Sequence, residues 1–191
     1  QPQEIGEMCC LGRCHENAAF HVDGLNYSGK NGFTLFENRA EKNNISPSDH
    51  YHIGYSGHSV LIQSDESRVF AVDCLKKVFS AGADGVLDEL KKSGLRGRGG
   101  AGFPIGFKLE SCKNTESDTK FIVCNADEGD PGAFSDRYIM ENIPVNLILG
   151  MIIAGYVTGA EWGVLYIRAE YPESIHMIQE TLQKMREWGL L

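Results

Sequence analysis

Hydrophobic and polar positions follow two different patterns, which meet near residue 65. Before it the chain is rich in Gly, Asn, Ser and His, which fits short strands and turns, with "VDGL" (22–25) as a candidate hairpin turn. Beyond it, apolar residues recur at helical spacing. The stretch 66–82 carries one such stripe and ends at Gly82; its members are Val69, Val72, Leu75, Val78 and Phe79.

The rest of the chain alternates between helical and strand-like patterns. Residues 83–94 predict a short helix with Asp84 as a candidate N-cap and Gly94 just past its end. The apolar run "KFIVCNAD" (120–127) predicts a buried parallel strand, and 162–171 a second strand. Further helices are predicted over 104–112, 134–142, 143–160 and 172–191. This order predicts an α/β fold with a parallel sheet.

Composition and charge narrow the class of protein. The chain has 191 residues, of which 42% are hydrophobic and 23% charged, as in ordinary soluble domains. Its net charge of -8 argues against nucleic acid or an anionic membrane as partner. The first residues lack the basic start of a signal peptide, and the apolar run 145–160 is too short and glycine-rich for a membrane span. These features predict a cytoplasmic protein whose cysteines are thiols, metal ligands or core residues.

A glycine-rich segment, "SGLRGRGGAGFPIGFK" (93–108), holds six glycines and three cationic residues. It contains G-x-G-x-x-G, but a predicted helix precedes it where the dinucleotide fingerprint needs a strand. Glycines nevertheless let a backbone approach a ligand closely, and the cations Arg96, Arg98 and Lys108 can bind an anion. A flexible surface loop with solvated arginines is the alternative.

The stretch "CNADEGDPGAFSDR" (124–137) follows the first predicted strand of the sheet. It lies at the carboxyl end of that strand, where α/β sheets bind ligands. Its Asn and Asp side chains can bond ribityl or ribose hydroxyls or the N–H edge of a heterocycle. An Asx-rich turn that caps the next helix is the alternative.

Four motifs together resemble one protein family: the two stretches above, "GMIIAGYVTGA" (150–160) and "YIRAEYP" (166–172). In order and spacing they are similar to the flavin-binding subunit of NADH dehydrogenase (complex I). The same motifs occur in subunits of NAD-reducing and electron-bifurcating hydrogenases and of NAD-dependent formate dehydrogenases. The resemblance covers about residues 86–191, and "EGDPGAF" looks closer to the hydrogenase and formate dehydrogenase relatives.

The resemblance implies a Rossmann-like domain that binds FMN and exchanges hydride with NADH. It places the FMN site on two groups of residues: Gly97, Arg98, Gly99, Gly100 and Lys108, then Asn125, Asp127 and Glu128. It also implies contacts of the dinucleotide with Phe103, Glu128 and Asp130. The chain departs from the family at Leu109, usually Trp, at Ser111, which is Phe in some members, and at Asp130, which is Glu in some.

The N-terminal cysteines carry a second resemblance. "CLGRCHENAAFHVDGLNY" is similar to the end of the thioredoxin-like [2Fe–2S] domain of complex I, where C-L-G-x-C supplies two of the four thiolates. Cys10 and Cys14 are therefore either half of a [2Fe–2S] site or relic residues. The pattern H-x-H at His50 and His52 is a candidate metal pair. No carboxylate or thiol has convincing spacing to complete such a site, so the sequence favours solvated loop histidines.

The resemblance also predicts a domain division and partners. Residues 1–36 are expected to be the end of the [2Fe–2S] domain, 37–65 a linker, and 66–191 the first part of the FMN domain, so that the chain is truncated at both ends. Other iron–sulfur subunits of a redox complex are the expected partners, without nucleic acid and without membrane insertion. An assembly module that docks on such subunits without binding FMN is the alternative.

Overall fold

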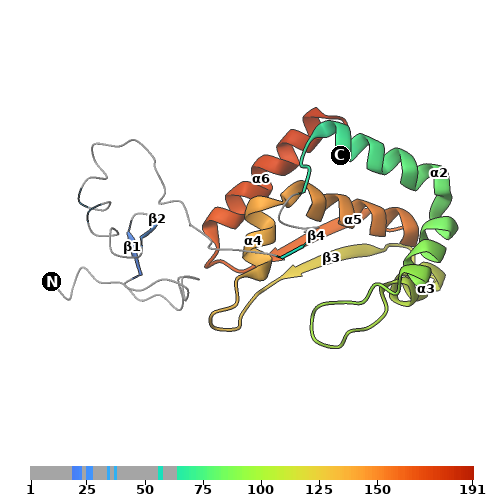
Figure 1. The fold of residues 1–191 in the computed structure, drawn as a ribbon, viewed down its shortest axis with the longest axis horizontal. Helices are drawn as coiled ribbons and strands as arrows, with labels where there is room; N and C mark the ends of the chain where they lie inside the picture. Colours follow the sequence, from blue (N-terminus) through green and yellow to red (C-terminus); the bar gives the residue numbers. More distant parts are fainter. Residues whose placement is uncertain (1–18, 23–24, 28–33, 35–36, 38–55, 58–63) are drawn as a thin grey trace.

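The computed structural model describes residues 19–22, 25–27, 34, 37, 56–57 and 64–191 (Figure 1). Near the N-terminus, strands β1 (Phe20–Val22) and β2 (Leu25–Tyr27) pair antiparallel across residues 23–24. The rings of Phe20 and Tyr27 stack with their centroids 5.3 Å apart. The hairpin that the sequence predicts around 22–25 is therefore confirmed.

The larger part of the described chain alternates helices and strands as the sequence predicts. Strands β3 (Phe121–Ala126) and β4 (Trp162–Ile167) pair in parallel, from Phe121 opposite Trp162 to Ala126 opposite Ile167. The helices are α2 (Arg68–Ser93), α3 (Ile105–Asn114), α4 (Ser135–Asn142), α5 (Pro144–Thr158) and α6 (Pro172–Glu187). This arrangement confirms the α/β fold with a parallel sheet.

Helix α2 differs from the prediction of two separate helices. It runs across Gly82, whose φ of 70° and ψ of 165° break the helical geometry and leave a kink. The Ser67 hydroxyl caps its start by accepting from the Phe70 N–H at 3.2 Å, and Gly94 ends it in the left-handed region. The predicted N-cap role of Asp84 is wrong, because its carboxylate binds the Lys113 ammonium of α3 instead.

Helix α5 is the centre of the core and contacts every other described helix and both parallel strands. Buried side chains of α5 pack against α2 and α6 in one cluster, formed by Ala71, Leu75, Val145, Ile148, Leu149 and Met185. A second cluster joins β3, α4 and α6 through Ala126, Met140, Tyr171 and Ile178.

Among the described residues no single helix is long and apolar enough to cross a membrane. Helices α4 and α5 reach that length and composition only when taken together, and their axes are bent by 97°.

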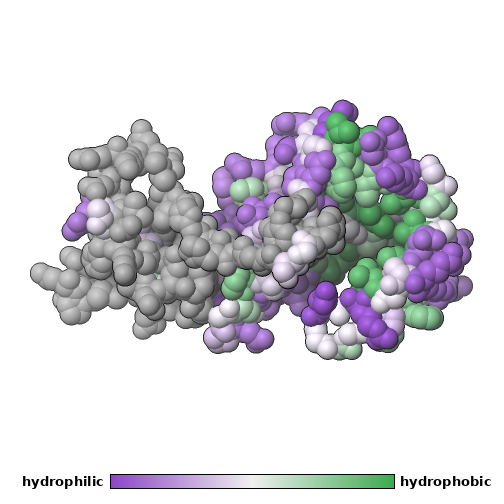
Figure 2. Space-filling model, viewed as in Figure 1, coloured by the Kyte–Doolittle hydropathy of each residue, from purple (hydrophilic) through white to green (hydrophobic). Residues whose placement is uncertain are grey.

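The two faces of the β3–β4 sheet have different surroundings. Side chains on one face are exposed, namely Phe121, Val123, Trp162, Val164 and Tyr166, whereas Ile122, Cys124, Leu165 and Ile167 on the other face are half-buried. The strand predicted as buried is therefore covered on one face only, because the described helices supply a single layer. Figure 2 shows that hydrophobic residues also reach the surface in the region where Figure 1 places α5, between hydrophilic patches.

A carboxylate from outside the helix caps the start of α5. The backbone N–H groups of Val145 and Asn146 donate to Glu66 at 2.6 and 3.3 Å, and the Asn146 side-chain amide also donates to it. Helix α5 has no capping side chain of its own. Because Glu66 stands directly before the Ser67 cap of α2, it fastens the start of α2 to the start of α5.

Replacing Glu66 by Gln should therefore lower the free energy of unfolding by about 1 to 2 kcal/mol, as loss of a helix cap does. Urea unfolding followed by circular dichroism measures this. Glu89→Gln is the matched control, because Glu89 is exposed and, among the residues that the structure describes, pairs only with Lys92 of its own helix. It should change stability by less than about 0.5 kcal/mol. Equal effects of the two substitutions would contradict the capping role of Glu66.

Candidate functional site

The glycine-rich segment forms a closed loop between α2 and α3. Its base is fixed by two backbone hydrogen bonds, from Gly97 N–H to Phe103 O at 2.9 Å and from Ile105 N–H to Leu95 O at 3.0 Å. The Arg96 guanidinium donates to Gly102 O at 2.9 Å, so this side chain stabilises the loop by a contact across it. The tip, residues 98–102, therefore projects from a fixed base.

The backbone at the tip is accessible. Gly100 and Gly102 adopt φ values of 99° and 59°, which side chains rarely tolerate. No atom lies within 4 Å of the position that a Cβ would take at Gly99 or Gly100. Gly106 differs, because a Cβ there would lie 2.8 Å from Lys91 Cγ and 3.0 Å from Lys91 N, so this glycine allows α3 to pack on α2.

Two cations at the loop are available to an anion. Arg98 and Lys108 are exposed, and among the described residues neither pairs with a carboxylate. Lys108 lies in the first turn of α3, a helix whose N-cap residue, Pro104, offers no side-chain cap. An uncapped helix start with bare glycines and two cations is the arrangement that binds phosphate in proteins.

The acidic turn, defined here as residues 127–134, connects β3 to α4. The Asn125 side-chain oxygen accepts from the Asp127 N–H at 3.1 Å, which makes an Asx turn. Asp127 and Asp130 are exposed, while Glu128 is half-buried and turned toward the protein. The side chains of Asp127 and Asp130 thus face solvent, whereas that of Glu128 faces the protein.

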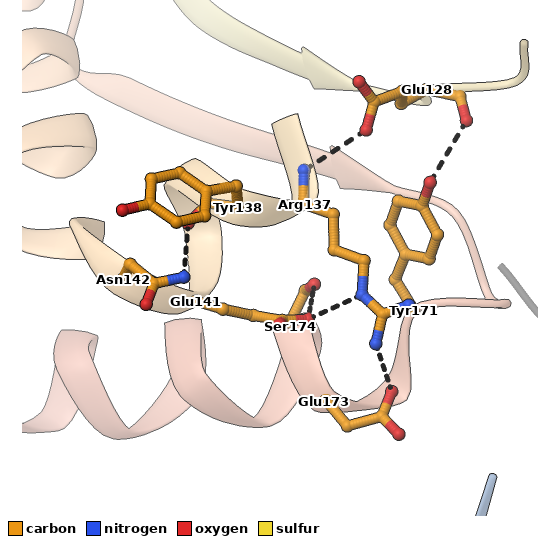
Figure 3. Close-up of polar contacts among 8 residues, drawn as sticks. All are labelled: Glu128, Arg137, Tyr138, Glu141, Asn142, Tyr171, Glu173 and Ser174. Atoms are coloured by element: carbon orange, nitrogen blue, oxygen red, sulfur yellow. Dashed lines mark hydrogen bonds and ion pairs between the residues drawn. The ribbon is translucent and has the colours of Figure 1, made fainter. Parts of the chain in front are cut away.

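Glu128 is bound on both its side chain and its backbone (Figure 3). Its carboxylate accepts from the Ser135 hydroxyl at 2.8 Å and from the N–H groups of Asp136 and Arg137 at 3.1 and 3.3 Å, and so caps α4. Its carbonyl accepts from the Arg168 guanidinium and from the Tyr171 hydroxyl at 3.4 Å. The alternative interpretation of this stretch as a helix-capping turn therefore holds for Glu128.

A buried ionic cluster lies behind the turn, and the sequence did not predict it. The fully buried Arg137 pairs with Glu141 at 2.9 Å and with Glu173 at 3.5 Å, and the Ser174 hydroxyl donates to Glu141 at 2.8 Å (Figure 3). The i, i+4 spacing of Arg137 and Glu141 is the one signal that could have revealed the pair. It could not reveal the burial or the partners on α6.

Burial and neighbouring charge shift several pKa values here. Burial, and then the Glu128 charge, raises the pKa of Asp136. Burial, and then the Asp136 charge, raises the pKa of the Cys124 thiol on β3. The pKa of Tyr171 is raised by burial and by Glu128, against the opposing effect of Arg168 and Arg137. The Tyr171 hydroxyl therefore remains a proton donor at neutral pH.

The predicted site residues thus fall on two loops. Gly97, Arg98, Gly99, Gly100 and Phe103 lie on the glycine loop, with Lys108 one turn into α3; Asn125, Asp127, Glu128 and Asp130 lie at the end of β3 and on the acidic turn. In the view of Figure 1 both loops project below β3. Phe103 and Phe107 are exposed. Cys10, Cys14, His50 and His52 lie outside the described residues.

An open pocket of about 690 Å³ lies elsewhere, between α5, α6 and the start of β4. It is mostly apolar, with Leu165, Leu182 and Leu190 among its walls. Three of its four strand residues, Ile122, Trp162 and Gly163, stand at the N-terminal ends of β3 and β4, and the fourth is Leu165 of β4. The pocket is therefore separate from the two loops, since the acidic turn follows the C-terminal end of β3.

Known proteins are similar to this chain in sequence. The HndC subunit of the NADP-reducing hydrogenase of Solidesulfovibrio fructosivorans is 48% identical over 117 residues, which cover 61% of this chain and 24% of that protein. An NADH-quinone oxidoreductase subunit of Rhizobium meliloti is 44% identical over 108 residues, 56% of this chain and 26% of that protein. The chain thus spans about a quarter of the length of these relatives.

A solved structure agrees with this similarity. A crystal structure of an air-oxidized NAD⁺-reducing [NiFe]-hydrogenase matches 94% of this chain and 33% of its own chain, with a TM-score of 0.68 and 26% identity. The model of the Complex1_51K family, described as the Nuo51 FMN-binding domain, matches residues 90–189, just over half of the chain and including both loops. The chain therefore belongs to this family of FMN-binding domains.

Proposed function

We propose that the chain is the flavin-site portion of an NAD(H)-linked electron-transfer subunit. It would support hydride transfer between NADH and FMN, with onward transfer of single electrons to iron–sulfur clusters. The observation that carries this proposal is the glycine loop, whose tip has bare backbone at Gly99 and Gly100 and the exposed Arg98. The loop leads into the start of α3, which has no side-chain cap and carries the exposed Lys108 in its first turn. The relatives are named as subunits of an NADP-reducing hydrogenase, an NADH-quinone oxidoreductase and an NAD⁺-reducing hydrogenase, which supports a nicotinamide dinucleotide as the substrate.

The residues of the glycine loop fit the phosphate of FMN. Gly99 and Gly100 would let the phosphate approach the backbone, and Arg98 and Lys108 would neutralise its charge. The N–H of Gly97 is bound to Phe103 O, so Gly97 would contribute by fixing the base of the loop. Because Arg96 already braces the loop, it is not assigned to the ligand.

The acidic turn fits the remainder of FMN. Asn125 uses its side-chain oxygen on the Asp127 N–H and keeps its NH₂ group to donate to the flavin. Asp127 is exposed and can accept from a ribityl hydroxyl. Glu128 contributes through the position of its backbone, since its carboxylate is bound to α4.

We assign the dinucleotide to exposed residues of the glycine loop and the acidic turn. Phe103, with 56% of its surface exposed, offers a flat face to an adenine ring. Asp130 is exposed on the acidic turn. Its carboxylate and the backbone at Glu128 would lie near the rest of NADH. FMN, when bound, supplies the two-electron to one-electron redox chemistry. The chain binds and orients both molecules, and no side chain needs to act as an acid or a base.

The same proposal covers the domain division and the partners. Residues 1–36 would end a thioredoxin-like [2Fe–2S] domain with Cys10 and Cys14 as two cluster ligands, 37–65 would link it, and 66–191 would begin the FMN domain. Iron–sulfur subunits of a cytoplasmic or peripheral redox complex would be the partners. The alternative, a docking module without FMN, gains no support from the described loops. Most of the residues expected to hold FMN are exposed there, namely Arg98, Gly99, Gly100, Lys108, Asn125 and Asp127.

Replacing Lys108 by Ala should weaken FMN binding about tenfold, because a charge-assisted contact to the phosphate is lost. Titration of the protein into FMN, followed by flavin fluorescence, gives the dissociation constant. Lys92→Ala removes another exposed lysine, which pairs with Glu89, and is the matched control with unchanged affinity. Unchanged FMN affinity in Lys108→Ala would count against this assignment of the phosphate site.

Replacing Phe103 by Ala should raise the KM for NADH roughly five- to tenfold while the bound FMN stays constant, because a stacking surface for adenine is lost. Dye reduction by the FMN-loaded protein, measured over a range of NADH concentrations, separates KM from kcat. Phe79→Ala, at an exposed phenylalanine on α2 whose ring contacts Tyr156, is the control. A lower kcat with an unchanged KM would refute the stacking role.

A further inference from the structure

The backbone of the acidic turn is held from the neighbouring strand. Arg168 directly follows β4, and Tyr171 directly precedes α6; both donate to the carbonyl oxygen of Glu128. Because β3 and β4 run in parallel, with Ala126 opposite Ile167, the segments that follow them start at the same edge of the sheet. The carbonyl of one loop thus meets the donors of the other.

Both donors are fixed by their own surroundings. Tyr171 is 1% exposed, and the guanidinium groups of Arg168 and Arg137 lie 5.2 and 5.3 Å from the centroid of its ring. Glu170 binds the Arg168 guanidinium at 3.4 Å through both Nε and Nη2. Neither donor can turn away from Glu128 without breaking these contacts as well.

The anchoring of Glu128 restricts the conformation of the exposed side of the turn. Glu128 is anchored at two points, its carboxylate at the start of α4 and its carbonyl at Arg168 and Tyr171. The neighbouring Asp127 and the nearby Asp130 are exposed. With Glu128 fixed, the backbone directions of these two residues are restricted too. The contacts of Arg168 and Tyr171 with Glu128 are hydrogen bonds to one backbone carbonyl, so the effect expected of them is local: they fix the geometry of the turn.

We propose that Arg168 and Tyr171 are positioning residues for the ligand site. They hold the Glu128 carbonyl from behind the acidic turn, so that Asp127 and Asp130 face the bound FMN and NADH in one orientation. Neither Arg168 nor Tyr171 is assigned a contact with the ligands. The inference deepens the proposed function and rests on it for the identity of the ligands, whereas the fixed conformation of the turn is a property of the protein without ligand.

The test uses Arg168→Met and Tyr171→Phe, singly and together. The FMN dissociation constant should rise about tenfold in Arg168→Met and about threefold in Tyr171→Phe. Because both donors serve one carbonyl, the double variant should be weakened by less than the product of the two single effects. Arg168→Lys keeps the charge and should recover part of the affinity. Arg186→Met and Tyr156→Phe, both at exposed positions on other surfaces, are the controls and should bind as wild type does.

Hydrogen–deuterium exchange of the FMN-free variants gives a readout that does not depend on ligand. Amides of residues 127–134 should exchange about tenfold faster in Arg168→Met, with exchange in β3 and α5 unchanged. Faster exchange throughout β3 and α5 would mark general destabilisation and overturn the positioning role, as would wild-type exchange in the turn. If the wild-type protein binds no FMN, the proposed function fails, while locally faster exchange in the variants still supports the hold on the turn.

Discussion

Glu128 joins the acidic turn to the start of α4, which follows it, and to the β4–α6 loop, which is distant in sequence. The candidate site depends on this junction. Its carboxylate satisfies the first amides of α4, while its carbonyl accepts from the two residues that bracket the β4–α6 loop. A buried backbone or charged group must find such partners, because leaving it unpaired costs free energy. The acidic turn therefore has a fixed inner side, and only its outer side, with Asp127 and Asp130, is free for ligands.

The same physical rule shapes the rest of the described fold. Glu66 satisfies the start of α5 from a position outside the helix. The Lys120 ammonium donates to the carbonyls of Lys113 and Thr158, near the ends of α3 and α5, at 2.8 and 3.2 Å. A negative charge thus binds the start of one helix, and a positive charge binds the ends of two helices. These are the signs that the helix dipole favours at each end. The start of α3, beside the glycine loop, has no such capping side chain, and that is where a phosphate is proposed to bind.

Much of the architecture could be predicted from local signals. Periodicity and caps predicted the helices and both parallel strands, and the hairpin at 22–25, because these signals act over a few residues. Gly82 was expected to separate two helices and instead kinks one. Arg137, Arg168 and Tyr171 could not be found as a cluster, because their contacts join β4 and α6 to α4 over long sequence separations. The site residues were named through family resemblance, and their assignment to ligands remains a prediction.

If the glycine loop and the acidic turn form an FMN site, the purified protein binds FMN in solution. FMN is titrated with the protein while flavin fluorescence is recorded, and the mixture is then passed through gel filtration. We expect saturable quenching at one FMN per chain and a yellow protein fraction with flavin absorption. Unquenched flavin and a colourless protein fraction would contradict the claim and favour a docking module without FMN.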